Sequence, residues 1–225
     1  MKKMNGLIFF STLILSCLLV SCAIGQQPND ETQSMNLIRE KVFQDSTHKS
    51  SEIRIQYPEF AQAEMQKINQ DIHRFATEIP KQIYGENYSD LQLQINYEIK
   101  VFNDKYLSIV FSGFGESGAA YPKNIFLTRN YDLERETSVK LSELYTIDLY
   151  FAQTIYTSVA AQNGEDVVNV FEADYPNTDT VFQALLACDT NIESCQSYLT
   201  STGIGICMPI RHIGGDYVCI ERSMH

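Results

Sequence analysis

The clearest alternation of apolar and polar residues lies near the middle of the chain. Apolar side chains occupy every second position from Leu91 to Val101, with glutamine, asparagine, glutamate and lysine between them. This period of two predicts a strand with one buried and one solvated face, as is usual in antiparallel sheets. Asn103 and Asp104 form a turn signal, so Tyr106–Phe111 is predicted to return as the second strand of a hairpin.

Weaker alternations predict two more strands, one before this hairpin and one after it. The first covers Glu52–Tyr57 and is expected to stop at Pro58, because proline cannot donate a hydrogen bond to a sheet. The second covers Ile125–Leu133. A glycine-rich segment, Gly113–Gly118, precedes it and is expected to form a tight irregular turn, because its spacing does not match that of a phosphate-binding loop.

A period near 3.6 residues replaces the alternation in two segments. In the first, apolar residues recur at steps of three and four, which predicts an amphipathic helix that Pro80 ends or kinks. Its apolar positions are Met65, Ile68, Ile72, Phe75 and Ile79. In the second segment the apolar positions run from Leu149 to Val159, and the predicted helix ends near Asn163.

The last part of the chain is less regular. It predicts one more helix around Thr180–Ala187, then a hairpin of Ser197–Ile206 and Asp216–Glu221 turning at Gly214-Gly215. Strands and helices thus come in runs, which indicates the α+β class. We expect a single domain over residues 51–225, with an antiparallel sheet and two or three packed helices.

The N-terminus has the form of a secretory signal. Lys2 and Lys3 precede an apolar stretch of 14 residues ending at Val20, about 21 Å as a helix and short of a hydrocarbon core of about 30 Å. The stretch closes on Leu-Val-Ser-Cys, which resembles a bacterial lipobox and predicts cleavage after residue 21 and lipidation of Cys22. A plain signal with an incidental cysteine and a short membrane anchor are the alternatives.

Residues 22–50 are polar without a sustained period, which predicts a tether between lipid and domain, with a short helix possible over Leu37–Phe43. Removal of residues 1–21 takes away two lysines and no acidic residue, so 204 residues remain and the net charge changes from −11 to −13. Two or more acyl chains would attach such a protein permanently to a bilayer. Ala23, rather than an aspartate, favours the outer membrane if the cell is Gram-negative.

Four cysteines remain after the signal and the lipidation site. Cys207 and Cys219 are equidistant from the turn of the last hairpin and can therefore lie opposite each other within disulfide range. Cys188 and Cys195 enclose a short loop and are predicted to form the second bridge. A zinc site is the alternative, although spacings of 7 and 12 residues differ from those of the usual paired ligands.

Composition narrows the classes of function. The acidic balance excludes nucleic acid as a partner, because phosphate binding needs clustered lysine and arginine. The sequence offers no nucleophile elbow and no helical pair of metal-binding histidines, so we expect no catalytic residue, metal or cofactor. His48 and His225 lie in the tether and at the chain end, and His73 is expected on a solvated helix face.

Two further sets of residues are candidates for binding. Arg211 and His212 near the last turn are expected to form a small polar site with Asp216 or Glu221. Tyrosines outside the apolar register are expected to be exposed and able to stack on sugar rings, namely Tyr84, Tyr88, Tyr121 and Tyr175.

The order of several short motifs resembles a known extracytoplasmic domain. These motifs are Tyr57-Pro58, Asn96-Tyr-Glu98, Leu107–Phe111, Gly118-Ala-Ala-Tyr-Pro122, Asn130-Tyr-Asp-Leu133 before Val139–Leu144, and Tyr198–Gly203. The series is similar to the domain of unknown function shared by lysozyme-sensing anti-sigma factors and the non-catalytic part of PdaC-type peptidoglycan deacetylases. The loop at 117–122 departs from the family's common Gly-Gly-Ala-His-Pro, and the deacetylase motif and a sigma-binding segment are missing from the sequence.

The resemblance implies an envelope setting and ligand recognition without deacetylation. We therefore expect a non-enzymatic, lipid-anchored protein that binds a wall-associated ligand, first a cationic, lysozyme-like muramidase, which a strongly acidic domain would attract. Direct binding of peptidoglycan or another glycan is the alternative, and a hydrolase with an unrecognised site is a third. The sequence does not identify the ligand-binding residues.

Overall fold

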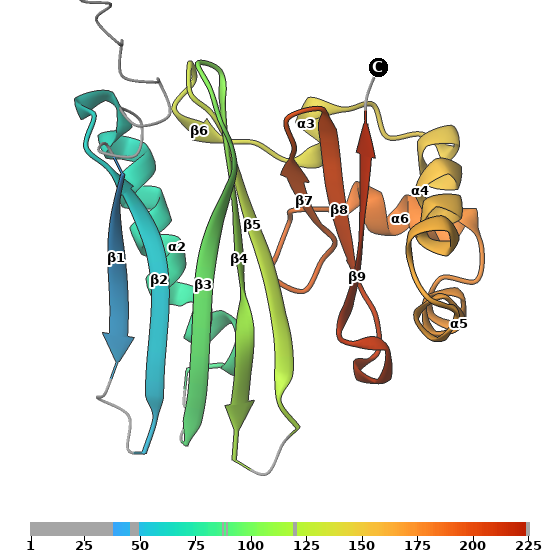
Figure 1. Cartoon of the computed structure of the whole chain (residues 1–225), viewed down its shortest axis with the longest axis horizontal. Helices are drawn as coiled ribbons and strands as arrows, with labels where there is room; N and C mark the ends of the chain where they lie inside the picture. The colour runs from blue at the N-terminus through green and yellow to red at the C-terminus, as the bar shows by residue number, and fades with distance from the viewer. Residues whose placement is uncertain (1–37, 46–49, 87, 89, 119–120, 224–225) are drawn as a thin grey trace, which may run out of the picture.

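The protein is described by a computed structural model that covers residues 38–45, 50–86, 88, 90–118 and 121–223 (Figure 1). The predicted signal segment, Cys22, His48 and His225 lie outside the described residues. Within them, no helix is both long enough and apolar enough to cross a membrane.

The larger of two sheets has six strands in the order of the chain. Neighbouring strands are antiparallel except β2 and β3, which are parallel and are connected by helix α2 (Gln66–Tyr84) after a short 3-10 turn, η1 (Ala63–Met65). The strands are β1 (Ile38–Asp45), β2 (Glu52–Phe60), β3 (Leu91–Phe102), β4 (Tyr106–Ser117), β5 (Lys123–Asp132) and β6 (Thr137–Ser138).

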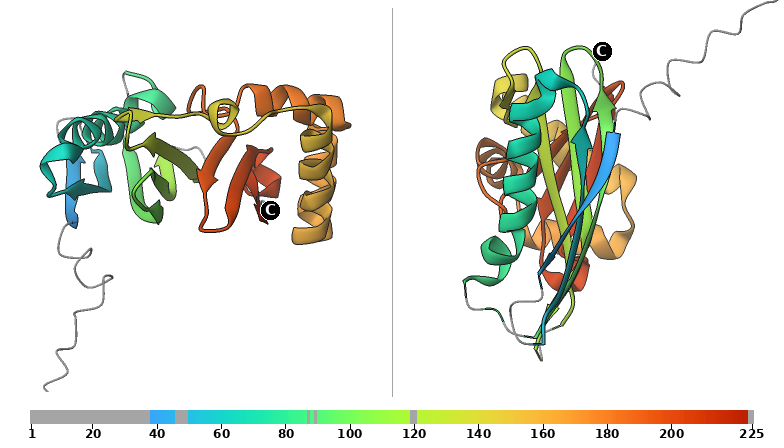
Figure 2. Two further views of the ribbon diagram at one scale, coloured as in Figure 1. Left: turned by 90° about the horizontal axis from the view of Figure 1, so that it is seen from above. Right: turned by 90° about the vertical axis from the view of Figure 1, so that its left-hand side faces the viewer.

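The smaller sheet contains the last three strands and lies beside β5. It consists of β7 (Gln196–Leu199), β8 (Gly203–Pro209) and β9 (Tyr217–Ser223), with a 3-10 turn, η2 (His212–Gly214), between β8 and β9. Four helices connect the two sheets, namely α3 (Leu141–Leu144), α4 (Leu149–Gln162), α5 (Glu165–Asp174) and α6 (Thr178–Leu186). Figure 2 shows α2 on one side of the larger sheet.

The core of the larger sheet forms as the apolar periodicities predict. The stripe of α2 packs against the buried positions of β3, where Leu91 and Ile95 are fully buried. The helix passes through Pro80 and ends at Tyr84, followed by Gly85, whose φ of 81° few other residues adopt. Of the two outcomes predicted for Pro80, an end or a kink of the helix, the end is therefore wrong. Pro80 is itself buried, which shows that packing against the sheet outweighs the hydrogen bond lost in the helix.

A second core lies between α4, α5 and α6 and strands β8 and β9. The helices predicted at Leu149–Val159 and around Thr180–Ala187 are confirmed as α4 and α6, whereas α5 was not predicted. Only Phe171 of α5 is fully buried, so this short helix has no complete apolar stripe from which it could have been recognised.

The predicted tether contains a strand where a short helix was considered. β1 pairs along its whole length with β2, so the part of residues 22–50 that the structure describes as a strand belongs to the sheet. It is an edge strand with no fully buried residue, which explains its weak apolar pattern. The predicted stop at Pro58 is wrong, because β2 continues through Pro58 to Phe60. Proline is tolerated at this position because β3 pairs with β2 only as far as Ile55, so no hydrogen bond from residue 58 to β3 is needed.

The glycine-rich segment is mostly strand, and the expectation of a tight turn was wrong. Gly113 and Gly115 lie within β4, opposite Ile95 and Leu93 of β3. A Cβ atom on Gly113 would stand 1.9 Å from the carbonyl oxygen of Gln94, so the glycine allows two backbones to approach closely. Gly118, with a φ of 61°, is the described glycine of this segment that has a turn conformation.

The α+β class is confirmed, although the arrangement is richer than expected. The sheet is split into two, one strand pair is parallel, and helices α2–α6 exceed the two or three that the sequence indicated. The predicted strand Ser197–Ile206 divides into β7 and β8 at Thr200–Gly203.

Buried polar side chains join the two sheets where β7 lies beside β5. The Asn130 carboxamide donates to the Ser197 carbonyl at 2.8 Å and accepts from the Ser108 hydroxyl at 2.7 Å, and that hydroxyl also accepts the Leu199 N–H. All these groups are buried. The sheets are thus connected through side chains instead of a continuous backbone ladder.

Candidate functional site

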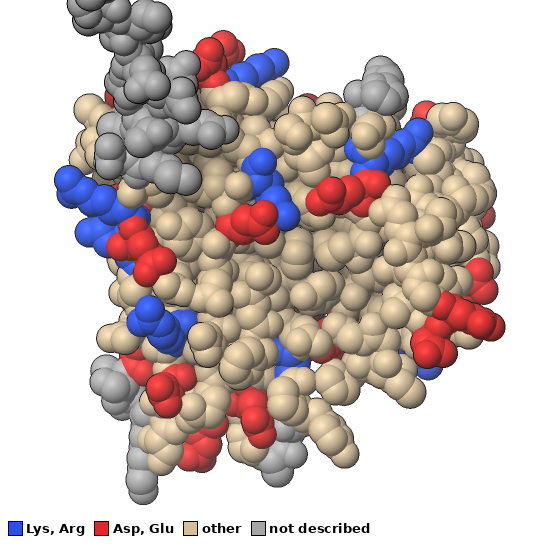
Figure 3. Space-filling model, viewed as in Figure 1, with Lys and Arg blue, Asp and Glu red and all other residues tan. Residues whose placement is uncertain are grey.

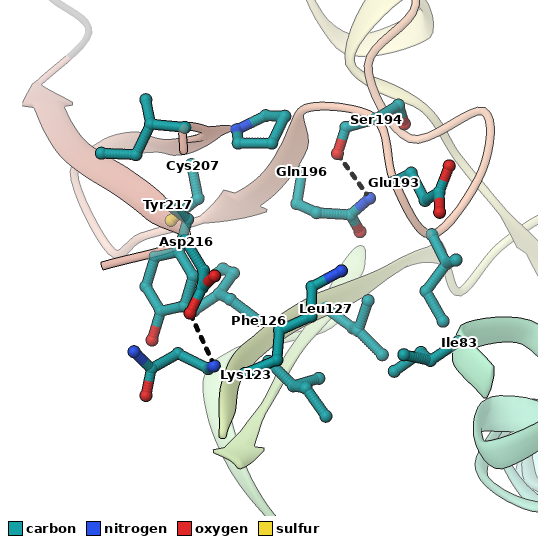
Figure 4. A pocket seen from close by; sticks show the side chains of 15 residues that line it. Ile83, Lys123, Phe126, Leu127, Glu193, Ser194, Gln196, Cys207, Asp216 and Tyr217 are labelled. Atoms are coloured by element: carbon teal, nitrogen blue, oxygen red, sulfur yellow. Dashed lines mark hydrogen bonds between the residues drawn. The ribbon is translucent and has the colours of Figure 1, made fainter. Parts of the chain in front are cut away.

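A pocket of about 290 Å³ opens where the two sheets separate (Figure 4). Strand β7 begins at Gln196, so residues 123–127 of β5, which pair with β4 on one side, have no strand of the described residues on the other side. The end of α2, the loop before β7 and the β8–β9 connection enclose the remaining space. Its apolar walls are Ile83, Ile125, Leu127, Ile192, Pro209 and Ile210.

Two side chains take the place of a neighbouring strand at the ends of this exposed edge. Asp216 Oδ2 accepts the Asn124 N–H at 2.8 Å, and Gln196 Oε1 accepts the Thr128 N–H at 3.2 Å. Glu193 adds an exposed acidic group to the lining, and Lys123 lies on β5 at the same pocket (Figure 4). The site is therefore a slot with apolar walls, hydrogen-bonding ends and carboxylates.

An aromatic and aliphatic rim stands beside the slot. His212 Nδ1 lies 3.0 Å from Asp216 Oδ1, and the Tyr121 ring stacks on the imidazole with centroids 6.0 Å apart. Tyr121 is 84% exposed and Ile213 is 85% exposed. We call Tyr121, His212 and Ile213 the rim. Exposed apolar groups that lie together beside a pocket, unlike single exposed ones, mark a candidate binding surface.

The predicted polar site is brought together only in part. His212 contacts Asp216 as expected, but Arg211 forms an ion pair with Asp174 of α5 at 2.7 Å. Glu221 accepts a hydrogen bond from the Tyr198 hydroxyl at 2.9 Å. Arg211 and Glu221 thus have other partners, because the 3-10 turn η2 carries Arg211 toward α5.

Of the four tyrosines predicted to be exposed, Tyr121 is the one that is. Tyr88 donates to Asp45, Tyr175 donates to the Pro209 carbonyl, and both pack on the apolar cores, where burial raises the pKa of each to about 12. Tyr84 lies over Gly115, with its hydroxyl 2.2 Å from where a Cβ of that glycine would be. Burial raises the pKa of Tyr84, and the charge of Asp216 raises it further.

The four late cysteines fall into the two predicted pairs. Cys207 and Cys219 lie directly opposite each other with Cα atoms 4.0 Å apart and form a disulfide. Cys188 and Cys195 are buried thiols whose sulfur atoms lie 2.6 Å apart. Among the described residues, no group of three or more potential metal ligands comes together.

We predict that Cys188 and Cys195 form a disulfide under oxidising conditions, because their sulfur atoms already lie side by side. The bridge would stabilise the fold by very roughly 2 to 3 kcal/mol. Peptide mapping without reduction should recover a 188–195 crosslink beside the 207–219 crosslink. Free thiols at 188 and 195 in protein isolated from the envelope would contradict this prediction.

The remaining histidine with a structural setting is His73, which is exposed on α2 as predicted and also contacts the Tyr57 hydroxyl at 2.9 Å. Arg129 of β5, which the sequence did not single out, stacks on Phe75 with its guanidinium 3.8 Å from the ring centroid. It lines a second, polar pocket of about 490 Å³ that shares Leu127, Glu193 and Gln196 with the first.

Of the residues that close the ends of the slot, sequence reasoning named Asp216 but not Gln196, and it did not predict the slot itself. The alternation of β5 was recognised, but the edge that it leaves open depends on where β7 begins, and no local pattern marks Gln196 or Glu193. The rim was found in part, since Tyr121 and His212 were both candidates.

Comparison with known proteins gives limited matches. No family model matches the chain, and no curated protein matches it. Two solved structures are described as DUF3298 family proteins. One, from Bacteroides fragilis NCTC 9343, is 12% identical over 83% of this chain and 89% of that protein, with a TM-score of 0.45. The other, from Pseudomonas aeruginosa PAO1, is 14% identical over 56% of this chain and 63% of that protein, with a TM-score of 0.36.

Proposed function

We propose that the protein is a non-enzymatic lipoprotein of the cell envelope that binds a cationic wall-associated protein, with a lysozyme-like muramidase as the first candidate. The observation that carries this proposal is the exposed rim beside a preformed slot. Tyrosine, isoleucine and histidine around a pocket provide the apolar anchor of a protein interface, and carboxylates around it provide charge. The resemblance to lysozyme-sensing domains agrees with such a partner.

Charge supports the same partner. Glu52, Gln92 and Glu116 stand in one row across β2, β3 and β4, and Asp90 adds an exposed carboxylate at the start of β3. Figure 3 shows acidic side chains at this lower end of the sheet and along the margin near α5. A basic protein would be attracted to this end before it reaches the rim.

The glycan alternative has less support in the structure. Binding of sugar rings by several tyrosines requires exposed rings, and three of the four candidates have half-buried positions in or against the cores. One exposed tyrosine beside charged groups fits a protein contact better than a stacking platform.

Attachment to the envelope is expected to depend on Cys22. Metabolic labelling with a fatty-acid analogue should mark the wild-type protein and leave Cys22→Ser unlabelled, because the thiol is the acceptor in the proposed lipidation. Equal labelling of both proteins would contradict the anchor and leave the binding proposal to be judged separately.

The rim is expected to carry much of the affinity. Replacing Tyr121 and Ile213 together by serine should weaken lysozyme binding at least about tenfold, because central apolar anchors contribute about 2 kcal/mol or more. Calorimetric titration would measure this. Tyr150→Ser is the matched control, since Tyr150 is 76% exposed on α4, away from the slot. Equal loss in both variants would contradict a specific role of the rim.

A further inference from the structure

The open edge of β5 presents one complete peptide group to the slot. Along an antiparallel strand, the N–H and C=O of successive residues point alternately to the two neighbours. Asn124 and Thr128 direct their N–H groups away from β4, toward Asp216 and Gln196, and the Asn130 carbonyl accepts the Val139 N–H on the same side. Phe126 has the same parity and therefore directs its N–H and C=O outward between them.

The hydrogen bonds at the two ends leave this middle position open. Asp216 satisfies the edge at Asn124 and Gln196 satisfies it at Thr128, whereas Phe126 lines the slot between the two (Figure 4). The two occupied donors are four residues apart, which is about 13 Å along a strand. This length corresponds to a short run of extended chain.

Strand β7 shows what fits in this position. Over Gln196–Leu199 it lies between β5 and β8, pairing with β8 and joined to β5 by side chains. Before Gln196 the chain turns away, and the same space continues downward as the slot, with Cys207 and Pro209 of β8 on its far wall. The slot therefore has the surroundings of a strand that β7 does not extend to fill.

We propose that the slot binds an extended, basic peptide segment of the partner as an additional strand, hydrogen-bonded to the N–H and C=O of Phe126. This proposal rests on the proposed function and specifies how the cationic partner is held. The peptide backbone supplies the acceptor and donor that the edge requires. The apolar walls suit the methylene stem of a lysine or arginine, and the exposed carboxylate of Glu193 suits its charged head.

Hydrogen exchange at Phe126 tests the proposal directly. In the full-length protein, purified in mild detergent, the Phe126 amide should exchange much faster than those of Ile125 and Leu127, whose N–H groups face β4. An acetylated and amidated pentapeptide of alternating lysine and valine, added until saturation, should slow exchange at Phe126 by about tenfold or more. The same peptide with every backbone amide N-methylated keeps the charge but has no backbone donor on either edge, and should leave exchange at Phe126 unchanged.

The outcomes separate this proposal from the proposed function. If lysozyme binds saturably while both peptides leave Phe126 unchanged, or protect it equally, strand addition is wrong and the receptor role stands. Slow exchange of Phe126 in the free protein would also overturn the inference, since the edge would already be paired. As a second readout, Phe126→Pro should bind the unmethylated peptide about tenfold more weakly than Phe126→Ala, because both lose the ring but only proline loses the donor. Equal affinity of these two variants would overturn the proposal.

Discussion

Replacing Asn130 by alanine is expected to lower the free energy of unfolding by about 3 kcal/mol. The substitution leaves the buried Ser197 carbonyl and Ser108 hydroxyl without the partners that Asn130 provides at 2.8 and 2.7 Å. A buried group without a partner costs about 1 to 3 kcal/mol. Urea denaturation of the purified protein measures the change.

Asn96→Ala is the matched control for this experiment. Asn96 lies on β3 with its side chain exposed, so its loss should change stability by no more than about 0.5 kcal/mol. If the two variants were equally stable, the side-chain contacts between the sheets would not contribute to stability as argued, and the placement of the slot beside them would lose its physical basis.

The second large effect is expected at Gly205 of β8. A Cβ atom there would lie 2.0 Å from the Tyr198 ring, which lies flat over the glycine on the neighbouring strand. The ring has little freedom to move, because its hydroxyl donates to Glu221 and its edge contacts Phe126. Gly205→Ala should therefore destabilise the protein by about 3 kcal/mol through overpacking.

Gly164→Ala provides the comparison, since no atom lies within 4 Å of the Cβ position at Gly164. Thermal unfolding of the two variants should show a marked decrease for position 205 and a clearly smaller one, equivalent to about 1 kcal/mol or less, for position 164, because Gly164 is the N-cap of α5, where alanine is less favourable than glycine. A similar decrease at both positions would indicate a general effect of losing glycine instead of the contact with Tyr198.

The elements that the sequence predicts well are those that have an unbroken apolar stripe facing the core. β3 and α2 have complete apolar stripes, so their periods are visible without any knowledge of their neighbours. β1 and α5 could not be recognised, because the first is an exposed edge and the second buries a single side chain fully. Gly113 was wrongly predicted to lie in a turn. Its role is to let the backbone of Gln94 on the neighbouring strand approach closely, and the residues around Gly113 do not indicate such a contact.

The same limit explains the candidate site. Cys207 and Cys219 were placed correctly because a hairpin relates them by local geometry. His212 and Asp216 were found for the same reason. The edge of β5 depends on β7, which lies about 70 residues away along the chain, and Gln196 reaches Thr128 across a sequence separation of 68 residues. No periodicity within either segment carries that information.

The central claim is that this domain recognises a cationic wall-associated protein through a specific surface. It is tested most directly by calorimetric titration of lysozyme into the full-length protein at low and at physiological salt. Exposed charges are screened over about 8 Å at physiological salt, so affinity should decrease, while contacts desolvated at the rim and slot should persist. We expect one saturable site that survives at physiological salt. Weak, non-saturating heat that appears only at low salt would contradict it.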